Sequence, residues 1–159
     1  MSRWYGCLLA FLLLSGCTDT KESSRPSDLE QKELKSVLLQ IDETTVPIRF
    51  VDNETAMALQ KRLPLTMQMK ELNGNEKYLK ELNGNEKYHY VPFSLPTNSK
   101  NVGMVQAGDL MLYGSDCLVL FYETFQTDIP YTRIGWVEPN RLPELLSADT
   151  VRVQMSTQQ

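Results

Sequence analysis

The sequence Gly108-Asp-Leu-Met-Leu-Tyr-Gly-Ser-Asp-Cys-Leu-Val-Leu-Phe-Tyr-Glu-Thr-Phe125 decides the fold, because it holds two apolar runs that are separated only by Gly-Ser-Asp. Apolar runs on either side of such a turn predict a β-hairpin, with strands over residues 110–113 and 117–122. The second run has no polar residue on either face, so protein must cover both of its faces. We therefore expect a central strand there, with the rest of the domain built around the hairpin.

Short strands and two helices flank this hairpin. A polar-to-apolar alternation, or a short apolar run, predicts further strands over residues 37–41, 46–51, 65–69, 88–91, 102–105, 131–137 and 150–155. Asp52-Asn53 forms an N-cap signal for a helix over residues 54–63, which Pro64 ends, and a second short helix is expected over residues 139–146. The predicted fold is mainly β, a closed barrel whose open ends the two helices plug.

The N-terminus predicts export. Arg3 precedes an apolar segment over residues 4–14, which is too short to span a bilayer. The segment ends in Leu14-Ser15-Gly16-Cys17, which resembles the lipobox of bacterial lipoproteins. The resemblance implies that residues 1–16 are a signal peptide and that Cys17 is acylated. The alternative is an ordinary secretory peptide in which this cysteine is accidental.

A polar, charged segment follows over residues 17–35 and lacks any apolar period, which predicts a disordered tether. The expected location is therefore the cell envelope, lipid-anchored on the periplasmic or outer side of a bacterial membrane. The membrane is one expected partner, through the N-terminal lipid. The sequence does not decide between inner and outer membrane.

A repeated segment interrupts the predicted domain, which spans residues 36–156. Lys70-Glu-Leu-Asn-Gly-Asn-Glu-Lys-Tyr78 recurs unchanged as Lys80-Glu-Leu-Asn-Gly-Asn-Glu-Lys-Tyr88. Two copies are too few for a solenoid. We predict a tandem duplicated hairpin loop over residues 70–88, in which one copy is extruded so that the strands on either side keep their register.

Several motifs together resemble the bacterial cyclophilin-like domain proteins, over residues 37–155. They are Leu63-Pro-Leu-Thr-Met, Leu82-Asn-Gly-Asn-Glu-Lys-Tyr, Ala107-Gly-Asp-Leu-Met-Leu-Tyr-Gly-Ser, Leu118-Val-Leu-Phe-Tyr and Tyr131-Thr-Arg-Ile-Gly. The resemblance implies a cyclophilin-like closed eight-stranded β-barrel with two short helices plugging its ends. That family carries the Asn-Gly-Asn-Glu-Lys-Tyr segment once, so this chain departs from it by one copy.

One string is similar to a segment of true cyclophilins, the prolyl isomerases. In Gly103-Met-Val-Gln-Ala-Gly-Asp109, Met104 and Gln106 match residues that line the proline pocket of that family. The catalytic arginine, however, falls on Asn98, and the pocket phenylalanine falls on Gly103. Without a guanidinium, no donor is present to weaken the conjugation of the prolyl amide. We therefore expect a non-catalytic binding module for a peptide or small molecule, with a weak peptidyl-prolyl cis/trans isomerase as the alternative.

The remaining candidates for chemistry are few. A net charge of −4 without a basic stripe argues against nucleic acid, and a single histidine excludes a histidine-based metal cluster, so we expect no metal and no cofactor. Cys117 and His89 could form a nucleophile pair, but a buried inert thiol and a surface imidazole on separate strands are expected instead. We expect a monomer. The predicted binding residues are Tyr88, Tyr90, Met104, Gln106, Tyr113, Tyr122 and Arg133.

Overall fold

The computed structural model describes residues 36–71 and 86–158. The predictions on the signal peptide, the acylation of Cys17 and the tether fall outside these residues, as does the middle of the repeated segment. In chain order the elements are β1 (Val37–Ile41), β2 (Thr44–Phe50), α1 (Glu54–Gln60), β3 (Leu65–Glu71), β4 (Glu86–Tyr90), β5 (Lys100–Val105), β6 (Asp109–Tyr113), β7 (Cys117–Phe121), β8 (Phe125–Val137), the 3₁₀ turn Pro139–Arg141, α2 (Leu142–Leu145) and β9 (Thr150–Thr157).

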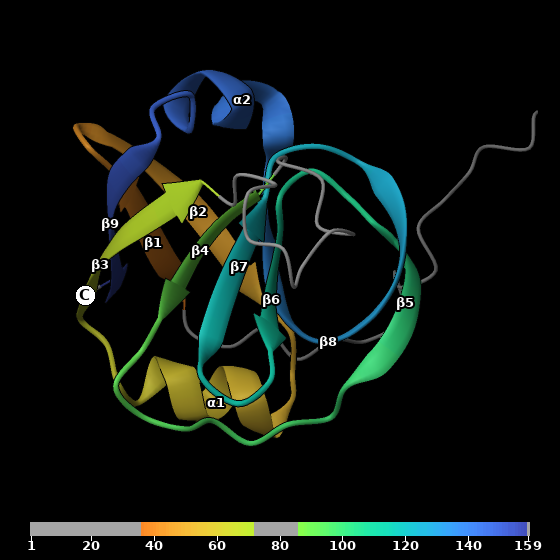
Figure 1. Ribbon diagram of the computed structural model, residues 1–159. Coiled ribbons are helices and arrows are strands. Elements are labelled where there is room, and N and C mark those ends of the chain that lie inside the picture. Colours follow the sequence, from red (N-terminus) through yellow and green to blue (C-terminus); the bar gives the residue numbers. More distant parts are fainter. Residues whose placement is uncertain (1–35, 72–85, 159) are drawn as a thin grey trace, which may run out of the picture.

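Eight of the strands close into an antiparallel barrel, which confirms the predicted fold. The order around the barrel is β2-β1-β9-β3-β4-β7-β6-β8, and β8 pairs back to β2 (Figure 1). Closure depends on Gly135 of β8, which lies opposite Phe50 of β2. A Cβ at Gly135 would lie 2.3 Å from the carbonyl oxygen of Arg49. Only glycine therefore allows the two strands to approach this closely.

The central hairpin is present as the sequence predicted. Tyr113 pairs with Cys117 at the turn between β6 and β7, and all five residues of β7 are buried. The strand alternates between two environments. Leu118 and Leu120 lie in the core inside the barrel, whereas Cys117, Val119 and Phe121 belong to a second apolar cluster on the outer face of the wall.

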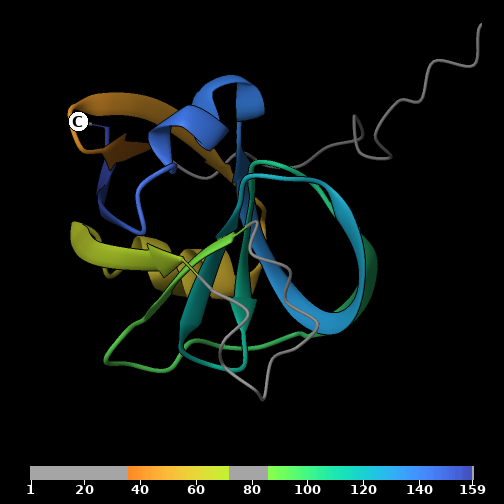
Figure 2. The ribbon, with the colours of Figure 1, turned by 45° about the horizontal axis from the view of Figure 1, so that its top comes forward.

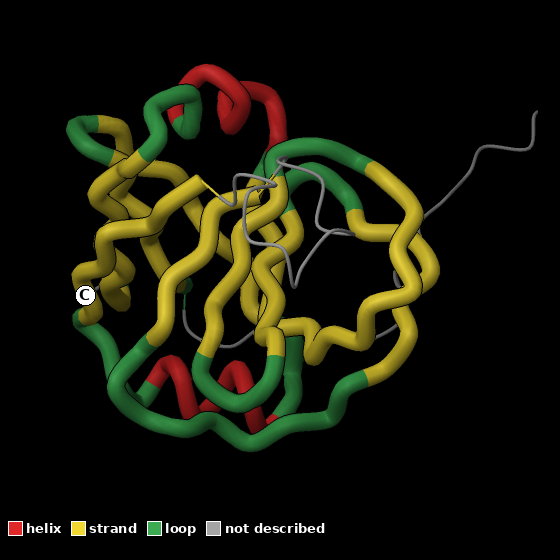
Figure 3. The backbone as a smooth tube through the Cα atoms, viewed as in Figure 1, coloured by secondary structure: helices red, strands yellow, loops and turns green. Residues whose placement is uncertain are grey.

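The two helices lie at opposite ends of the barrel (Figure 3). Asn53 caps α1 as predicted, because its side-chain Oδ1 accepts a hydrogen bond from the Ala56 N–H at 2.8 Å. Its Nδ2 also donates to the carbonyl oxygen of Arg133 at 2.7 Å, which ties the start of the helix to β8. Both helices are shorter than predicted: α1 ends at Gln60, and the second region begins as a 3₁₀ turn.

A two-stranded arm leaves the barrel and curves over its outer face (Figures 1 and 2). The arm consists of β5 and the first half of β8, which pair from Lys100 with Tyr131 to Val105 with Phe125. The sequence had predicted a strand only over residues 131–137, whereas β8 runs through Phe125–Val137. Pro130 is tolerated because, among the strands that the structure describes, only β5 pairs with this half of β8.

The repeated segment supplies the ends of two neighbouring strands. Lys70 pairs with Tyr88, and Glu71 pairs with Lys87, in antiparallel register. The first copy therefore provides the end of β3, and the second copy provides the start of β4. Residues 72–85, which join them, lie outside the described residues.

Candidate functional site

The candidate functional residues lie on the two faces of strand β4, one inside the barrel and one outside it. In its register with β7, Glu86 lies opposite Phe121, Lys87 opposite Leu120, and Tyr88 opposite Val119. Because side chains alternate along a strand, Lys87 faces the barrel interior with Leu120, and Glu86 faces the outside with Phe121. The ionisable side chains of two adjacent residues therefore lie on opposite faces of the barrel wall.

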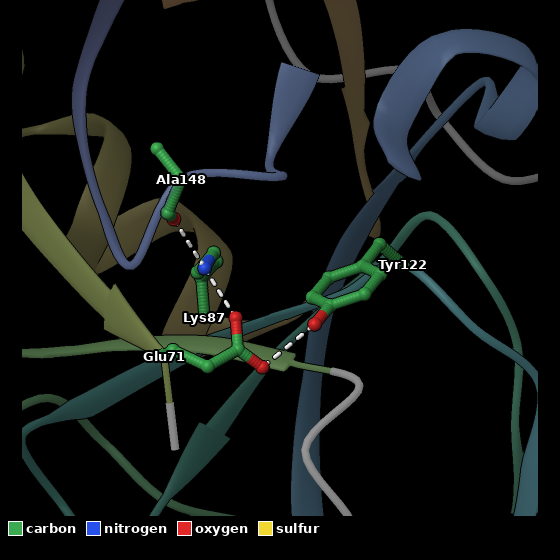
Figure 4. Close-up of polar contacts among 4 residues, drawn as sticks. All are labelled: Glu71, Lys87, Tyr122 and Ala148. Carbon is green, nitrogen blue, oxygen red and sulfur yellow. Dashed lines mark hydrogen bonds and ion pairs between the residues drawn. The ribbon is translucent and has the colours of Figure 1, made fainter. Parts of the chain in front are cut away.

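On the inner side, Lys87 is fully buried and its ammonium group has two hydrogen-bond acceptors (Figure 4). Its Nζ donates to the Glu71 carboxylate and to the carbonyl oxygen of Ala148, the latter at 2.6 Å. The Tyr122 hydroxyl donates to Oε1 of Glu71 at 2.6 Å. Burial, and then the hydrogen bond to Glu71, raise the pKa of Tyr122. This inner network neutralises its own charge, so it is a structural link between β3, β4 and the segment before β9.

The outer side of the same wall carries an aromatic cluster beneath the arm. We call it the outer-face cluster, and its buried members are Val105, Met111, Cys117, Val119, Phe121 and Tyr131. The ring of Phe121 is its centre: its centroid lies 5.4 Å from that of Tyr131 and 5.7 Å from that of Phe125, in edge-to-face contacts. Burial raises the pKa of the Cys117 thiol to about 12, so this sulfur is inert, as expected.

Two polar side chains are buried beside this cluster and have no hydrogen-bond partner within residues 36–71 and 86–158. Glu86 is 0% exposed and Tyr131 is 1% exposed. Among the described residues, both carboxyl oxygens of Glu86 and the hydroxyl of Tyr131 lack a hydrogen-bond partner. Each such atom costs about 1–3 kcal/mol, and folded proteins keep few of them without a reason.

The protonation of Glu86 follows from this environment. Burial, and then the charge of Glu71, raise the pKa of Glu86 to about 8. At neutral pH its carboxyl group therefore carries a proton. Burial and the proximity of Glu86 also raise the pKa of Tyr131, so the phenol stays protonated.

An open groove adjoins this region where β3 and β4 diverge. The two strands pair only at Lys70 with Tyr88 and at Glu71 with Lys87. Beyond these pairs lies a hollow of about 340 Å³, which we call the β3–β4 groove; its lining residues are Gln68, Lys70, Tyr88, His89 and Tyr90. Its volume is in the range of small-molecule sites.

The side chains of the groove combine aromatic area with polar groups. The rings of Tyr88 and Tyr90 meet edge to face at 5.9 Å, and Tyr90 is 55% exposed. Nδ1 of His89 lies 3.0 Å from the carbonyl oxygen of Gln68 and so bridges the gap between the strands. His89 pairs with Leu118, on the face opposite to Cys117, which rules out the nucleophile pair weighed from the sequence.

The structure does not bring the seven predicted binding residues into one site. Tyr88 and Tyr90 line the β3–β4 groove, and Tyr113 packs at the border of the outer-face cluster, with its ring 6.0 Å from that of Tyr131. Tyr122 lies on the inner side of the wall with Glu71.

The other three predicted binding residues lie along the arm and next to its base. Met104 is 45% exposed on β5. The backbone N–H of Gln106 donates to Oδ2 of Asp109 at 2.9 Å, and Arg133 lies 3.5 Å from the same oxygen. At the position that matches the catalytic arginine, Asn98 donates its backbone N–H to the Thr132 hydroxyl at 3.0 Å.

Glu86, Lys87 and Glu71 were not predicted as site residues. In the sequence they belong to polar repeats around Asn-Gly, which is typical of an exposed turn. The one available signal is the two-residue period Glu86, Tyr88, Tyr90, which places the carboxyl group on the aromatic face once the strand is extended back to residue 86.

The sequence matches a profile of the Cyclophilin-like family in two segments, residues 39–80 and 79–156. The chain therefore belongs to the Cyclophilin-like family. The two matched segments meet at the boundary between the two copies of the repeat, in keeping with one additional copy. Comparison with curated proteins gives no significant match.

Two solved structures share the fold. One is the solution structure of the hypothetical protein AF2241 from Archaeoglobus fulgidus, with 16% identity and a TM-score of 0.55; the match covers 83% of this chain and 100% of that one. The other is McbB in complex with tryptophan, with 14% identity and a TM-score of 0.51; it covers 77% of this chain. This chain spans 44% of the length of McbB. At such low identity these similarities support the fold alone.

Over residues 36–71 and 86–158, no three side chains of His, Cys, Asp or Glu are grouped so that they could hold a metal ion. None of the helices described there has the length and apolar character to cross a membrane.

Proposed function

We propose that this protein is a non-catalytic binding module that holds a peptide or small molecule in the β3–β4 groove. The observation that carries the proposal is the groove itself, in which two tyrosine rings, an imidazole and the Lys70 ammonium surround a hollow of about 340 Å³. Aromatic side chains supply contact area with a polar end, and the few polar groups fix the orientation of a ligand.

The backbone of β3 favours an extended ligand. On its β4 side, β3 pairs only through Lys70 and Glu71, so no residue of β4 pairs with the stretch from Leu65 to Met69. A peptide can add a strand to such an edge, with its side chains against Tyr88 and Tyr90. A small aromatic molecule would use the tyrosine rings without the edge.

An NMR titration of the full-length chain with short peptides and small aromatic molecules tests the groove. We expect binding compounds to perturb the backbone signals of Gln68, Tyr88 and His89. Tyr90→Ala should weaken this binding, because Tyr90 provides the most exposed ring. Met57→Ala, which removes an exposed apolar side chain from α1, is the matched control and should bind as the parent does. Compounds that bind without affecting the groove, or equally to Tyr90→Ala, would refute the proposal.

We also propose that the module is a lipoprotein of a bacterial cell envelope, held at the membrane through Cys17. Support comes from the lipobox-like sequence Leu14-Ser15-Gly16-Cys17 after a short apolar segment. Several acyl chains bind a bilayer far more firmly than one. Cys17→Ala should leave an uncut precursor that takes up no labelled palmitate. Label uptake by that variant would contradict the assignment.

A protease-coupled assay with a proline peptide separates binding from isomerisation. We expect no acceleration by the full-length chain, because Asn98 cannot supply the guanidinium of a cyclophilin. An acceleration that disappears in Gln106→Ala would replace the binding module with an isomerase.

A further inference from the structure

We propose that the outer-face cluster contains a second site, which binds a small primary ammonium ion between the Glu86 carboxylate, the Tyr131 hydroxyl and the ring of Phe121. This site goes beyond the β3–β4 groove and uses none of the residues that line it. When the ligand enters, the carboxyl group of Glu86 transfers its proton to solvent, and the resulting carboxylate pairs with the ammonium ion.

The polar atoms of the site match the hydrogen-bonding groups of an ammonium ion in number. Both oxygens of the Glu86 carboxyl group and the oxygen of Tyr131 lack partners among the described residues. A primary ammonium group carries three N–H donors and no acceptor. Once Glu86 has lost its proton, its two oxygens and the Tyr131 oxygen provide an acceptor for each of the three N–H donors, which removes the penalty of these unpaired acceptor atoms.

The second argument is the position of these atoms around one ring. Glu86 lies directly across from Phe121 in the β4–β7 register. The Tyr131 ring stands edge to face with Phe121, with centroids 5.4 Å apart and an interplanar angle of 87°. Aromatic rings in contact with a carboxylate form a favourable environment for an organic cation.

The third argument is the sign of the surrounding charge. The inner Lys87 is a nearby cation, but Glu71 and Ala148 already engage it. Among the described residues, the acids that interact electrostatically with Glu86 are Glu71 of β3, Cys117 of β7, Tyr122 after β7 and Tyr131 of β8. The thiol and the two phenols are neutral, whereas the Glu71 carboxylate disfavours an anion and favours a cation beside Glu86.

Titration of the full-length chain with n-butylammonium tests this site, and n-butanol is the neutral probe of the same heavy-atom number. We expect n-butylammonium to shift the carboxyl ¹³C signal of Glu86 saturably at pH 7, and n-butanol to leave it unchanged. Calorimetry in two buffers with different ionisation enthalpies should show release of about one proton per ligand bound. Equal effects of the two probes, or no saturable shift with n-butylammonium, would overturn the proposal.

Variants separate a binding site from a purely structural defect. Glu86→Gln keeps the shape but cannot become an anion, so it should weaken n-butylammonium binding by about tenfold or more. Tyr131→Phe removes one acceptor and should weaken binding by about threefold to tenfold. Tyr113→Phe removes a hydroxyl from the border of the same cluster and is the matched control, which should bind as the parent does.

Two outcomes distinguish this site from the groove. Tyr90→Ala should leave n-butylammonium binding intact while it weakens binding in the β3–β4 groove. Retention of full n-butylammonium binding by Glu86→Gln, with its fold verified by NMR, would overturn the ammonium site and leave the proposed function untouched.

Discussion

Glu86 and Lys87 are neighbours in one strand and both are fully buried. They differ in the face of the barrel wall that they occupy and in their hydrogen-bond partners. Lys87 faces the barrel interior, where Glu71 and Ala148 accept its hydrogen bonds. Glu86 faces the outer-face cluster, where its carboxyl oxygens have no partner among the described residues. Removing a partner from a buried ion pair destabilises a fold strongly, whereas a buried polar group that has no partner among the described residues is itself retained at a cost. The comparison therefore separates a structural residue from a candidate binding residue.

The largest expected effect in this comparison is on stability as a function of pH. The free energy of unfolding should depend on pH because of Glu86. The folded chain keeps the Glu86 proton up to about pH 8, whereas the ordinary glutamate pKa of 4.5 applies to the unfolded chain. Between these values the folded state binds more protons, so stability falls as pH rises, and the loss is complete above about pH 8. At about 1.4 kcal/mol per pKa unit, the upper bound of this loss is about 5 kcal/mol.

Glu86→Gln should remove this part of the pH dependence. Urea unfolding of the parent and the variant at a series of pH values from 4.5 to 8.5 measures it. The advantage of the variant should grow steadily with pH. An advantage that stays constant with pH would show that Glu86 titrates normally.

On the inner side, Lys87→Met should destabilise the fold by about 3 kcal/mol, because it leaves the Glu71 carboxylate, which is only 13% exposed, without its cation. Urea unfolding at pH 7 checks this value. The double variant Lys87→Met, Glu71→Gln has no unpaired charge and should recover most of the loss. If the single variant is as stable as the parent, the inner network is not structural.

Tyr122→Phe should have a smaller effect, of about 1 to 2 kcal/mol, because Glu71 loses one charge-assisted hydrogen bond but keeps Lys87. Thermal unfolding at pH 7 measures it, and Tyr113→Phe is the control with the same chemical change. If both variants lose the same stability, the bond from Tyr122 to Glu71 contributes nothing specific.

The smallest effect is expected from deleting one copy of the repeat, residues 71–80. After the deletion Glu81 follows Lys70 and takes the place of Glu71 opposite Lys87, so the β3–β4 register is kept. The shorter connection lowers the entropic free-energy cost of closing the loop, by about 0.6 kcal/mol for each halving of the loop length. The deletion variant should be as stable as the parent or more stable by up to about 1 kcal/mol. A loss above about 2 kcal/mol would mean that the additional copy is part of the core.

The fold could be predicted largely from local patterns. The apolar run of β7, the Asn53 cap and the alternation in β9 are all present where the sequence indicates them. The first half of β8 was missed because Pro130 and the polar residues around it do not favour a strand, whereas the strand predicted over residues 102–105 is present as part of β5. This half of β8 forms through pairing with β5, a contact between segments that are distant in sequence.

The candidate site was less predictable for the same reason. Tyr88 and Tyr90 could be proposed because aromatic residues alternate in a strand, and they do share one groove. Glu86 and Lys87 have the composition of a surface turn, yet both are fully buried in the folded chain. Neither composition nor periodicity reports such burial, because it depends on tertiary packing.

The most direct test of the central claim is the pKa of Glu86, measured by ¹³C NMR titration of its side-chain carboxyl group in the full-length chain. We expect a midpoint of about 8, because the group is buried, lacks a hydrogen-bond partner in the described part of the chain and lies close to Glu71. Lys87→Met removes the cation that offsets the charge of Glu71 and should move the midpoint higher still. A midpoint near the ordinary value of 4.5 would contradict the account, because Glu86 would then be solvated or paired.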